Sequence, residues 1–273
     1  MSDSLSFMLL EISKSDVAAS EILSHNGLYA QAVFHLQQAV EKSLKAVLIA
    51  LKIAPEDKEK LERWLTKKLR HEIVTKLPEI AEGLFEGACG SIESLEDVEN
   101  RQLALLLINS LRRVFKRLKQ EFNEKIEKSK KVDITKNEDV DEFVNLILQD
   151  IQDRNLTKIK NKEEVIGEII RSIKQTSISL KREQLPAAPD LIVTQLQKEI
   201  ENRLPLITAA CQLVALSLLL EKYAINSRYP KATVPTLGPH ILKKGYPLVD
   251  RLELLQQCAK NTINQLNDIL LQK

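Results

Sequence analysis

The residues best suited to chemistry lie on one face of the segment 29–46. Glu41 and Lys45 are four positions apart, so in a helix they share a face and can form an ion pair with the acid first. Phe34 and Gln38 fall on the same face. In a cleft, Lys45 can contact a phosphate as a point charge. On a solvated face, the pair would add only about 0.3–0.5 kcal/mol to helix stability. The residues alone leave both interpretations open.

Apolar residues in the same segment predict the helix that positions this face. They recur at three- and four-residue steps, which indicates one buried stripe: Val33, Leu36, Val40, Leu44, Val47 and Leu51. We expect the helix to open near Asn26-Gly27 and to run to about Lys52. A helix needs only this stripe to fold, so the polar face has no structural role that the sequence reveals.

Three further residues can bind a ligand. His71 lies in a predicted helix over residues 57–77, and Arg228 and Tyr229 follow a predicted core helix. An Arg side chain suits bidentate phosphate contact, and Tyr229 can stack on a base. The alternatives are structural: His71 can be a satisfied buried residue, and Arg228 can pair with Glu41 or with a helix C-terminus.

The segment from Gly27 to Ala46 resembles the HEPN (higher eukaryotes and prokaryotes nucleotide-binding) domain family. The matching residues are Gly27, Tyr29, Ala32-Val33, Gln37-Gln38-Ala39, Glu41-Lys42 and Leu44-Lys45-Ala46. His71 and the Arg228-Tyr229-Pro230 stretch correspond to two weaker family landmarks. The resemblance implies that Glu41, Lys45, His71, Arg228 and Tyr229 are nucleotide- or phosphate-binding candidates. It also implies a homodimer and a possible nucleotidyltransferase partner.

Composition favours an all-α fold, because Leu, Ile, Lys, Glu and Gln dominate and 44% of the residues are hydrophobic. The family implies an up-and-down helical bundle. We expect residues 1–77 and 205–273 to form this bundle, split by an inserted helical lobe of unknown role over residues 78–204.

Within this plan, the first helix covers about Leu5 to Leu23, with Leu9, Ile12, Val17 and Ile22 among its apolar positions. The run from Leu206 to Leu220 predicts a buried core helix, and a last helix follows Pro247. In the insertion, we expect a helix over 101–126, a polar linker over Glu127 to Glu138 and a helix that begins near Val140.

The spacing of Arg and His argues against ribonuclease activity. Ribonucleases of the family carry an Arg followed by a His after four to six residues, whereas the next His after Arg228 is His240. We therefore expect no catalytic residues and favour a protein that is not an enzyme. The four histidines also lack metal-ligand spacing, so we expect neither a metal site nor a cofactor.

A basic stripe in the middle of the chain leaves RNA binding open. Its core is Arg112, Arg113, Lys116, Arg117 and Lys119. Such a stripe can bind phosphates, can be a solvated face or can dock the acidic segment 79–99. The net charge of +2 does not decide between these interpretations.

Together these features predict a non-catalytic HEPN-like module that binds a nucleotide or a protein, with a nucleotidyltransferase as the candidate partner. Two alternatives remain: a toxin-like HEPN protein, as in a toxin–antitoxin pair, that binds or cleaves RNA, and a structural helical scaffold without a ligand. Three scattered cysteines indicate thiols in a reducing cytoplasm. No apolar run reaches the roughly 20 residues of a membrane span, so we expect no membrane association.

Overall fold

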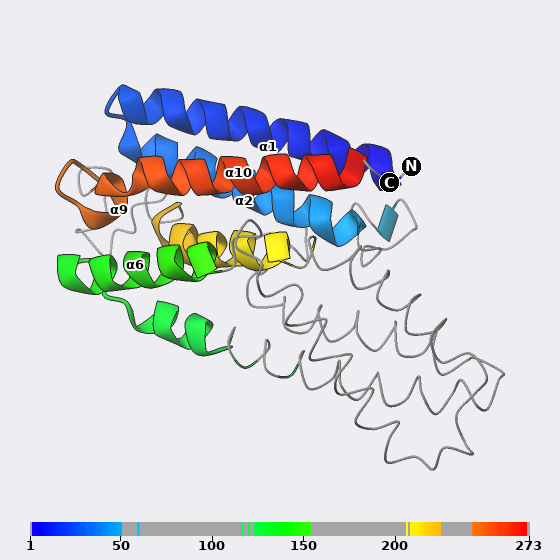
Figure 1. The fold of residues 1–273 in the computed structure, drawn as a ribbon. Coiled ribbons are helices and arrows are strands. Elements are labelled where there is room, and N and C mark those ends of the chain that lie inside the picture. The colour runs from blue at the N-terminus through cyan, green and yellow to red at the C-terminus, as the bar shows by residue number, and fades with distance from the viewer. Residues whose placement is uncertain are drawn as a thin grey trace, which may run out of the picture. The chain divides into compact units, whose positions relative to one another are not determined.

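The computed structural model describes residues 2–50, 59–60, 116, 120, 123–153, 206, 208–224 and 242–271. These residues form helices joined by turns and include no strand, which confirms the all-α fold class (Figure 1). The longest helices are α1 (Ser2–His25), α2 (Tyr29–Ala50), α6 (Asn137–Asp153) and α10 (Leu252–Leu271). The predictions at Leu51, at 101–115 and over all of 57–77 except 59–60 lie outside the described residues.

The chain divides into two compact units. One contains Met1–Thr75, Ile126–Asn155 and Pro205–Lys273, and the other contains Lys76–Lys125 and Leu156–Leu204. The first unit therefore takes in α6, although α6 lies within the range 78–204 that the sequence suggests is an insertion. A separate helical lobe over that whole range stays a prediction.

A tight turn joins α1 to α2. The amide of Leu28 donates to the carbonyl of Leu23 at 2.9 Å, and the amide of Gly27 donates to the carbonyl of Ser24 at 3.0 Å. This pair of bonds is the Schellman motif, which needs a left-handed residue after the helix. Gly27 supplies it with φ of 75°, which explains why glycine opens the motif of the second helix.

Small residues form the seam between α1 and α2. Ser20 on α1 donates to the carbonyl of Ala32 on α2 at 2.8 Å, so the two backbones approach closely there. Moving seven residues back along α1 and seven residues forward along α2 leads to the next pair of facing residues in this antiparallel register. They place Ser13 opposite Ala39 and Ser6 opposite Ala46. All of these side chains are buried, so the hairpin is tightly packed along its length.

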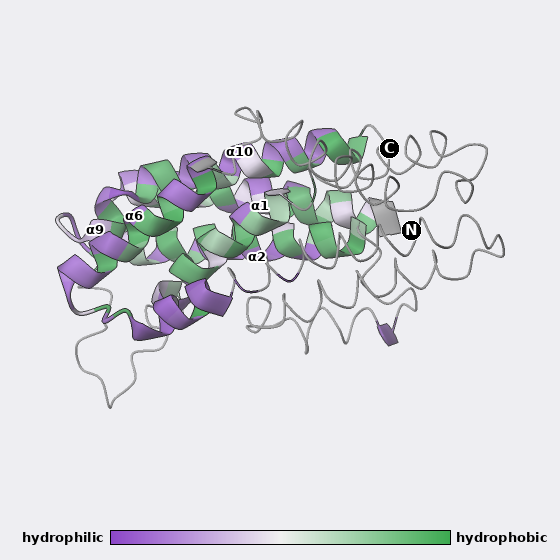
Figure 2. Cartoon of the chain, turned by 60° about the horizontal axis from the view of Figure 1, so that its bottom comes forward, coloured by the Kyte–Doolittle hydropathy of each residue, from purple (hydrophilic) through white to green (hydrophobic). Residues whose placement is uncertain are grey.

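α2 is the most enclosed of the long helices. The predicted stripe is confirmed from Val33 to Val47, where its five members are at most 1% exposed. Between Ala30 and Ala50 only Gln31 is exposed to solvent. Hydrophobic residues accordingly dominate α2 in Figure 2, whereas hydrophilic and hydrophobic residues alternate along α10. The second face of α2 is half-buried, so it is neither core nor open surface.

The core helix predicted from Leu206 is present. Residues 208–224 are helical, and every residue from Cys211 to Leu220 is buried. Gln212 within this run connects two neighbours: its amide donates to the carbonyl of Ile151 on α6 at 3.4 Å, and its carbonyl accepts from Thr262 on α10 at 3.1 Å. A helix buried on all sides lies at the centre of its unit.

α10 closes the bundle against the hairpin. The buried Gln256 donates to Ser20 at 2.9 Å and to Ser24 at 3.2 Å, and Lys260 pairs with Glu21 at 3.0 Å. The predicted last helix is divided, because Arg251 separates α9 (Pro247–Asp250) from α10. The apolar residues that recur at three- and four-residue steps are buried in both parts, from Leu248 to Leu270.

The segment before α6 differs from the prediction. The expected polar linker over Glu127 to Glu138 is helical from 123 to 131, and α6 begins at Asn137. The reason is packing that the local composition does not show. Ile126 and Ser129 are buried, and Lys222 of the core helix donates to the carbonyls of Ser129 and Val132. A cation is favourable at this helix C-terminus.

Candidate functional site

The ion pair predicted on α2 is present and is largely enclosed. The ammonium of Lys45 lies 2.7 Å from a carboxylate oxygen of Glu41, and the two side chains are 14% and 13% exposed. An exposed pair at this spacing would be solvated and weak. This pair is shielded on most sides, so it lies in the kind of environment in which charges interact strongly and are costly to leave unpaired.

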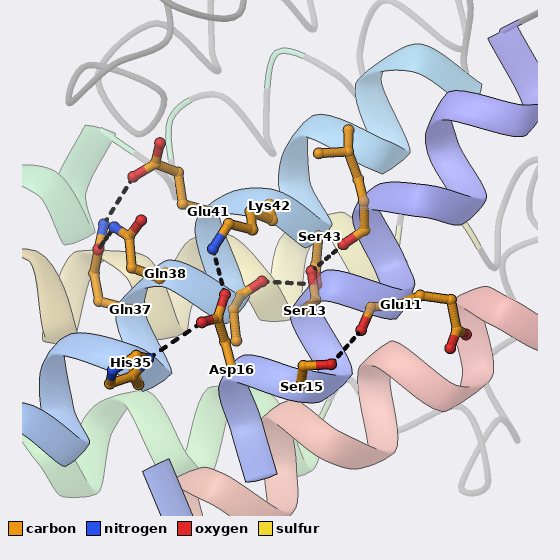
Figure 3. Close-up of polar contacts among 12 residues, drawn as sticks. Glu11, Ser13, Ser15, Asp16, His35, Gln37, Gln38, Glu41, Lys42 and Ser43 are labelled. Carbon is orange, nitrogen blue, oxygen red and sulfur yellow. Dashed lines mark hydrogen bonds and ion pairs between the residues drawn. The ribbon is translucent and has the colours of Figure 1, made fainter. Parts of the chain in front are cut away.

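Two amides extend the pair along α2. Gln37 donates to the second carboxylate oxygen of Glu41 at 3.2 Å, and Gln38 donates to the carbonyl oxygen of Gln37 at 2.7 Å (Figure 3). Glu41 thus accepts from a cation and from an amide. We call Gln37, Gln38, Glu41 and Lys45 the α2 polar cluster.

A second carboxylate faces the cluster from the core helix. Burial raises the pKa of Glu221 to about 7, and the negative charge of Glu41 raises it further in the same direction. At neutral pH, a substantial fraction of the Glu221 side chains therefore carries a proton. Sequence reasoning missed this residue. The sequence did contain a signal for it: Glu221 directly follows the apolar run that ends at Leu220, so its carboxylate lies on the continuation of a buried helix.

Another face of α2 carries a separate polar cluster that the sequence did not predict. Asp16 of α1 accepts from Lys42 and lies 3.2 Å from Nδ1 of His35, both on α2 (Figure 3). His35 also contacts Phe34 edge-on, with ring centroids 5.4 Å apart. Only the antiparallel register of α1 and α2 brings these residues together. The cluster joins the two helices and has an evident structural role.

The structure does not bring all the predicted residues together. Glu41 and Lys45 are in contact. His71, Arg228 and Tyr229 lie outside the described residues, so their place in a shared cleft stays a prediction. Within the basic stripe, Lys116 is described and exposed, while Arg112, Arg113, Arg117 and Lys119 lie outside the described residues.

The arrangement suits binding better than metal chemistry. Among the residues that the structure describes, no three His, Cys, Asp or Glu side chains gather in a way that could hold a metal ion. The described cysteines, Cys211 and Cys258, are free thiols. A shallow pocket of about 170 Å³ lies between α1 and α10, and none of the α2 polar cluster lines it. The α2 polar cluster offers a cation, two amides and the carboxylate of Glu41. Glu221 beside it adds a second carboxyl group whose charge changes near neutral pH.

Comparison with known families decides how this hairpin is classified. Residues 8–122 match the family model of the HEPN domain. The segment 8–122 is therefore similar to a HEPN domain. The match includes the Schellman turn at Gly27 and both members of the Glu41–Lys45 pair, so the resemblance read from the motif is confirmed.

The HEPN match covers only some of the predicted site residues. It includes the position of His71 but ends before Arg228 and Tyr229. It extends past residue 77, where the sequence suggested that the family segment breaks off. Searches of curated proteins and of solved structures find no match to the chain. In the part of the chain that the structure describes, no helix has the length and apolar character to span a membrane.

Proposed function

We propose that this chain is a non-catalytic HEPN module whose α2 polar cluster binds the phosphate of a nucleotide. The observation that carries the proposal is the enclosure of the Glu41–Lys45 pair, whose side chains are 13% and 14% exposed within the HEPN match. A helix–helix contact does not require two charges at these positions, and a hydrophobic pair of similar volume often replaces a buried ion pair without loss of stability.

The cluster provides complementary groups for a phosphate. Lys45 supplies a cation and the amides of Gln37 and Gln38 supply neutral donors. The carboxylate of Glu41 would repel the ligand, unless Lys45 turns from Glu41 toward the phosphate. Proton uptake by Glu221 lowers the negative charge beside the site. Phosphate binding should therefore be stronger below pH 7 than above it.

The experiment is thermal unfolding with ATP, GTP, UTP and short RNAs. A ligand at 100 times its dissociation constant should stabilise the protein by about 2.7 kcal/mol. Lys45→Gln removes the cation but retains a polar partner for Glu41, and it should abolish the shift. Lys130→Gln is the matched control, because Lys130 pairs with Glu127 at 2.7 Å on an exposed helix face. It should retain the shift.

Each alternative function predicts a different result in the same experiment. If no ligand shifts the transition of the wild-type protein, the module is a scaffold or binds a protein. A shift with RNA alone, lost in Arg112→Ala or Arg113→Ala but kept in Lys45→Gln, would assign binding to the basic stripe. RNA breakdown that disappears in Arg228→Ala would establish the ribonuclease alternative.

The partners implied by the family are also proposals. We propose a homodimer and, as a second partner, a nucleotidyltransferase. We further propose that the protein acts in the cytoplasm, where its free thiols remain reduced. Sedimentation of the purified chain tests the homodimer. Binding of a purified nucleotidyltransferase to the chain tests the second partner.

A further inference from the structure

The imidazole ring of His35 has a fixed orientation although part of it is open to solvent. Its Nδ1 lies 3.2 Å from a carboxylate oxygen of Asp16 (Figure 3). The edge-on contact with Phe34, at an interplanar angle of 70°, restrains the ring from a second direction. The His35 side chain is nevertheless 35% exposed. A reagent from solvent can therefore reach a ring whose direction is already set.

The hydrogen bond to Asp16 determines which ring nitrogen can react. A carboxylate only accepts hydrogen bonds, so the proton of the neutral His35 ring lies on Nδ1. Nε2 then carries a lone pair, and it has no hydrogen-bond partner among the residues that the structure describes. A carboxylate bound to one ring nitrogen makes the other nitrogen more basic. Nε2 of His35 is thus an oriented nucleophile.

Lys42 adds a positive charge to the same cluster. Its ammonium binds the second carboxylate oxygen of Asp16, and its side chain is 26% exposed. Because Lys42 balances the charge of Asp16, an anionic group that approaches His35 meets no net negative charge from these three residues. The exposed His25 differs in this respect, because its Nδ1 lies 2.7 Å from the backbone carbonyl of Glu21 instead of a carboxylate.

We propose that His35 is a phosphorylation site whose phosphoryl donor is a small acyl phosphate. The lone pair of Nε2 attacks phosphorus and forms a P–N bond, while the P–O bond to the acyl group breaks and a carboxylate leaves with the electron pair. The proton stays on Nδ1, where Asp16 stabilises the positive charge that the ring gains. Lys42 can turn from Asp16 to the phosphoryl oxygens, whose charge it neutralises.

The class of donor follows from the leaving group. Transfer to an imidazole requires a leaving group that is a weaker base than imidazole itself. The conjugate acid of a carboxylate has a pKa of about 4, against about 6.5 for imidazolium, so an acyl phosphate meets this requirement. Modification of His35 requires no nucleotide at the α2 polar cluster, which consists of other residues.

The experiment is incubation of the full chain with acetyl phosphate, followed by mass spectrometry of the intact protein and of its peptides. We expect one phosphoryl group that is labile in acid, stable in alkali and located on His35. His35→Gln should not acquire it. His25→Gln is the matched control and should react at the wild-type rate, because His25 is exposed but has no carboxylate at Nδ1. A wild-type chain that gains no such group, or gains it equally at His25, would overturn the proposal.

Two variants test how the neighbours of His35 act. Lys42→Gln retains a hydrogen-bond donor for Asp16 but removes the positive charge, and Asp16→Asn replaces the carboxylate by an amide that can donate to Nδ1. Each should slow phosphoryl transfer roughly 10-fold or more. Nitrogen NMR of the ring should show the Nδ1–H tautomer in wild type and in Lys42→Gln, and its loss in Asp16→Asn. Circular dichroism checks that both variants are folded. Transfer at the wild-type rate in both would mean that exposure alone governs the reaction, and the proposed site would be wrong.

Discussion

Replacing Glu221 by glutamine should stabilise the protein at pH 8 and leave its stability almost unchanged at pH 5. The pKa of Glu221 is about 7 in the folded chain, against 4.5 for an unperturbed glutamate. The folded state therefore holds a proton that the unfolded state releases between these values. Stability falls as pH rises through this window, because the unfolded state binds fewer protons there. Glutamine is neutral throughout and removes this loss.

The magnitude follows from the shift. A rise from 4.5 to about 7 corresponds to about 3 kcal/mol at 1.36 kcal/mol for each pH unit. The Glu221 side chain is half-buried, so solvent screening reduces the expected gain to roughly 1–2 kcal/mol. The assay is urea unfolding of both proteins at pH 5 and pH 8, with the free energies extrapolated to water.

The control for this experiment is Glu127→Gln. The hydrogen bond and charge of Lys130 lower the pKa of Glu127, so its replacement should cost stability at pH 8 instead of adding it. If Glu221→Gln and wild type show the same pH dependence, the carboxyl of Glu221 ionises normally. The Glu221 carboxyl would then not be buried beside Glu41.

Two further predictions concern the hairpin. Gly27→Ala should destabilise the protein by about 1 kcal/mol in thermal unfolding, because φ is 75° while open space surrounds the added methyl group; Gly27→Asn should cost less. An equal loss for both would show that strain is not the cause. Asp16→Asn should cost about 1–2 kcal/mol in urea unfolding, because it removes the carboxylate shared by Lys42 and His35. An unchanged midpoint would show that this cluster does not hold α1 to α2.

Local patterns predicted the helices well. The stripe on α2, the glycine at its start and the buried core helix all follow from periodicity and turn chemistry, which depend only on neighbouring residues. The sequence suggested a polar linker after residue 126 because Glu and Lys dominate there. The helix persists to residue 131 because Lys222, far along the chain, holds its C-terminal carbonyls.

The candidate site was only partly predictable for a related reason. Glu41 and Lys45 lie on one helix, so their spacing was sufficient to pair them. Glu221 reaches the same site from a helix 180 positions away, and Asp16 reaches His35 only through the register between two helices. Neither distance nor register can be read from periodicity. Ile12 and Ile22, named among the apolar positions of the first helix, are exposed in the structure, because periodicity identifies an apolar stripe but not what covers it.

The buried bond from Gln256 to Ser20 has a consequence for how the chain reaches its native state. It spans 236 positions, so closing the bundle means closing a very long loop. The entropic cost of closure grows only logarithmically, by about 0.6 kcal/mol for each doubling of loop length. The α1–α2 hairpin is joined by local contacts, so it can form before α10 packs against it. The length of the intervening chain can therefore change greatly through insertion or deletion at little thermodynamic cost to the closed bundle.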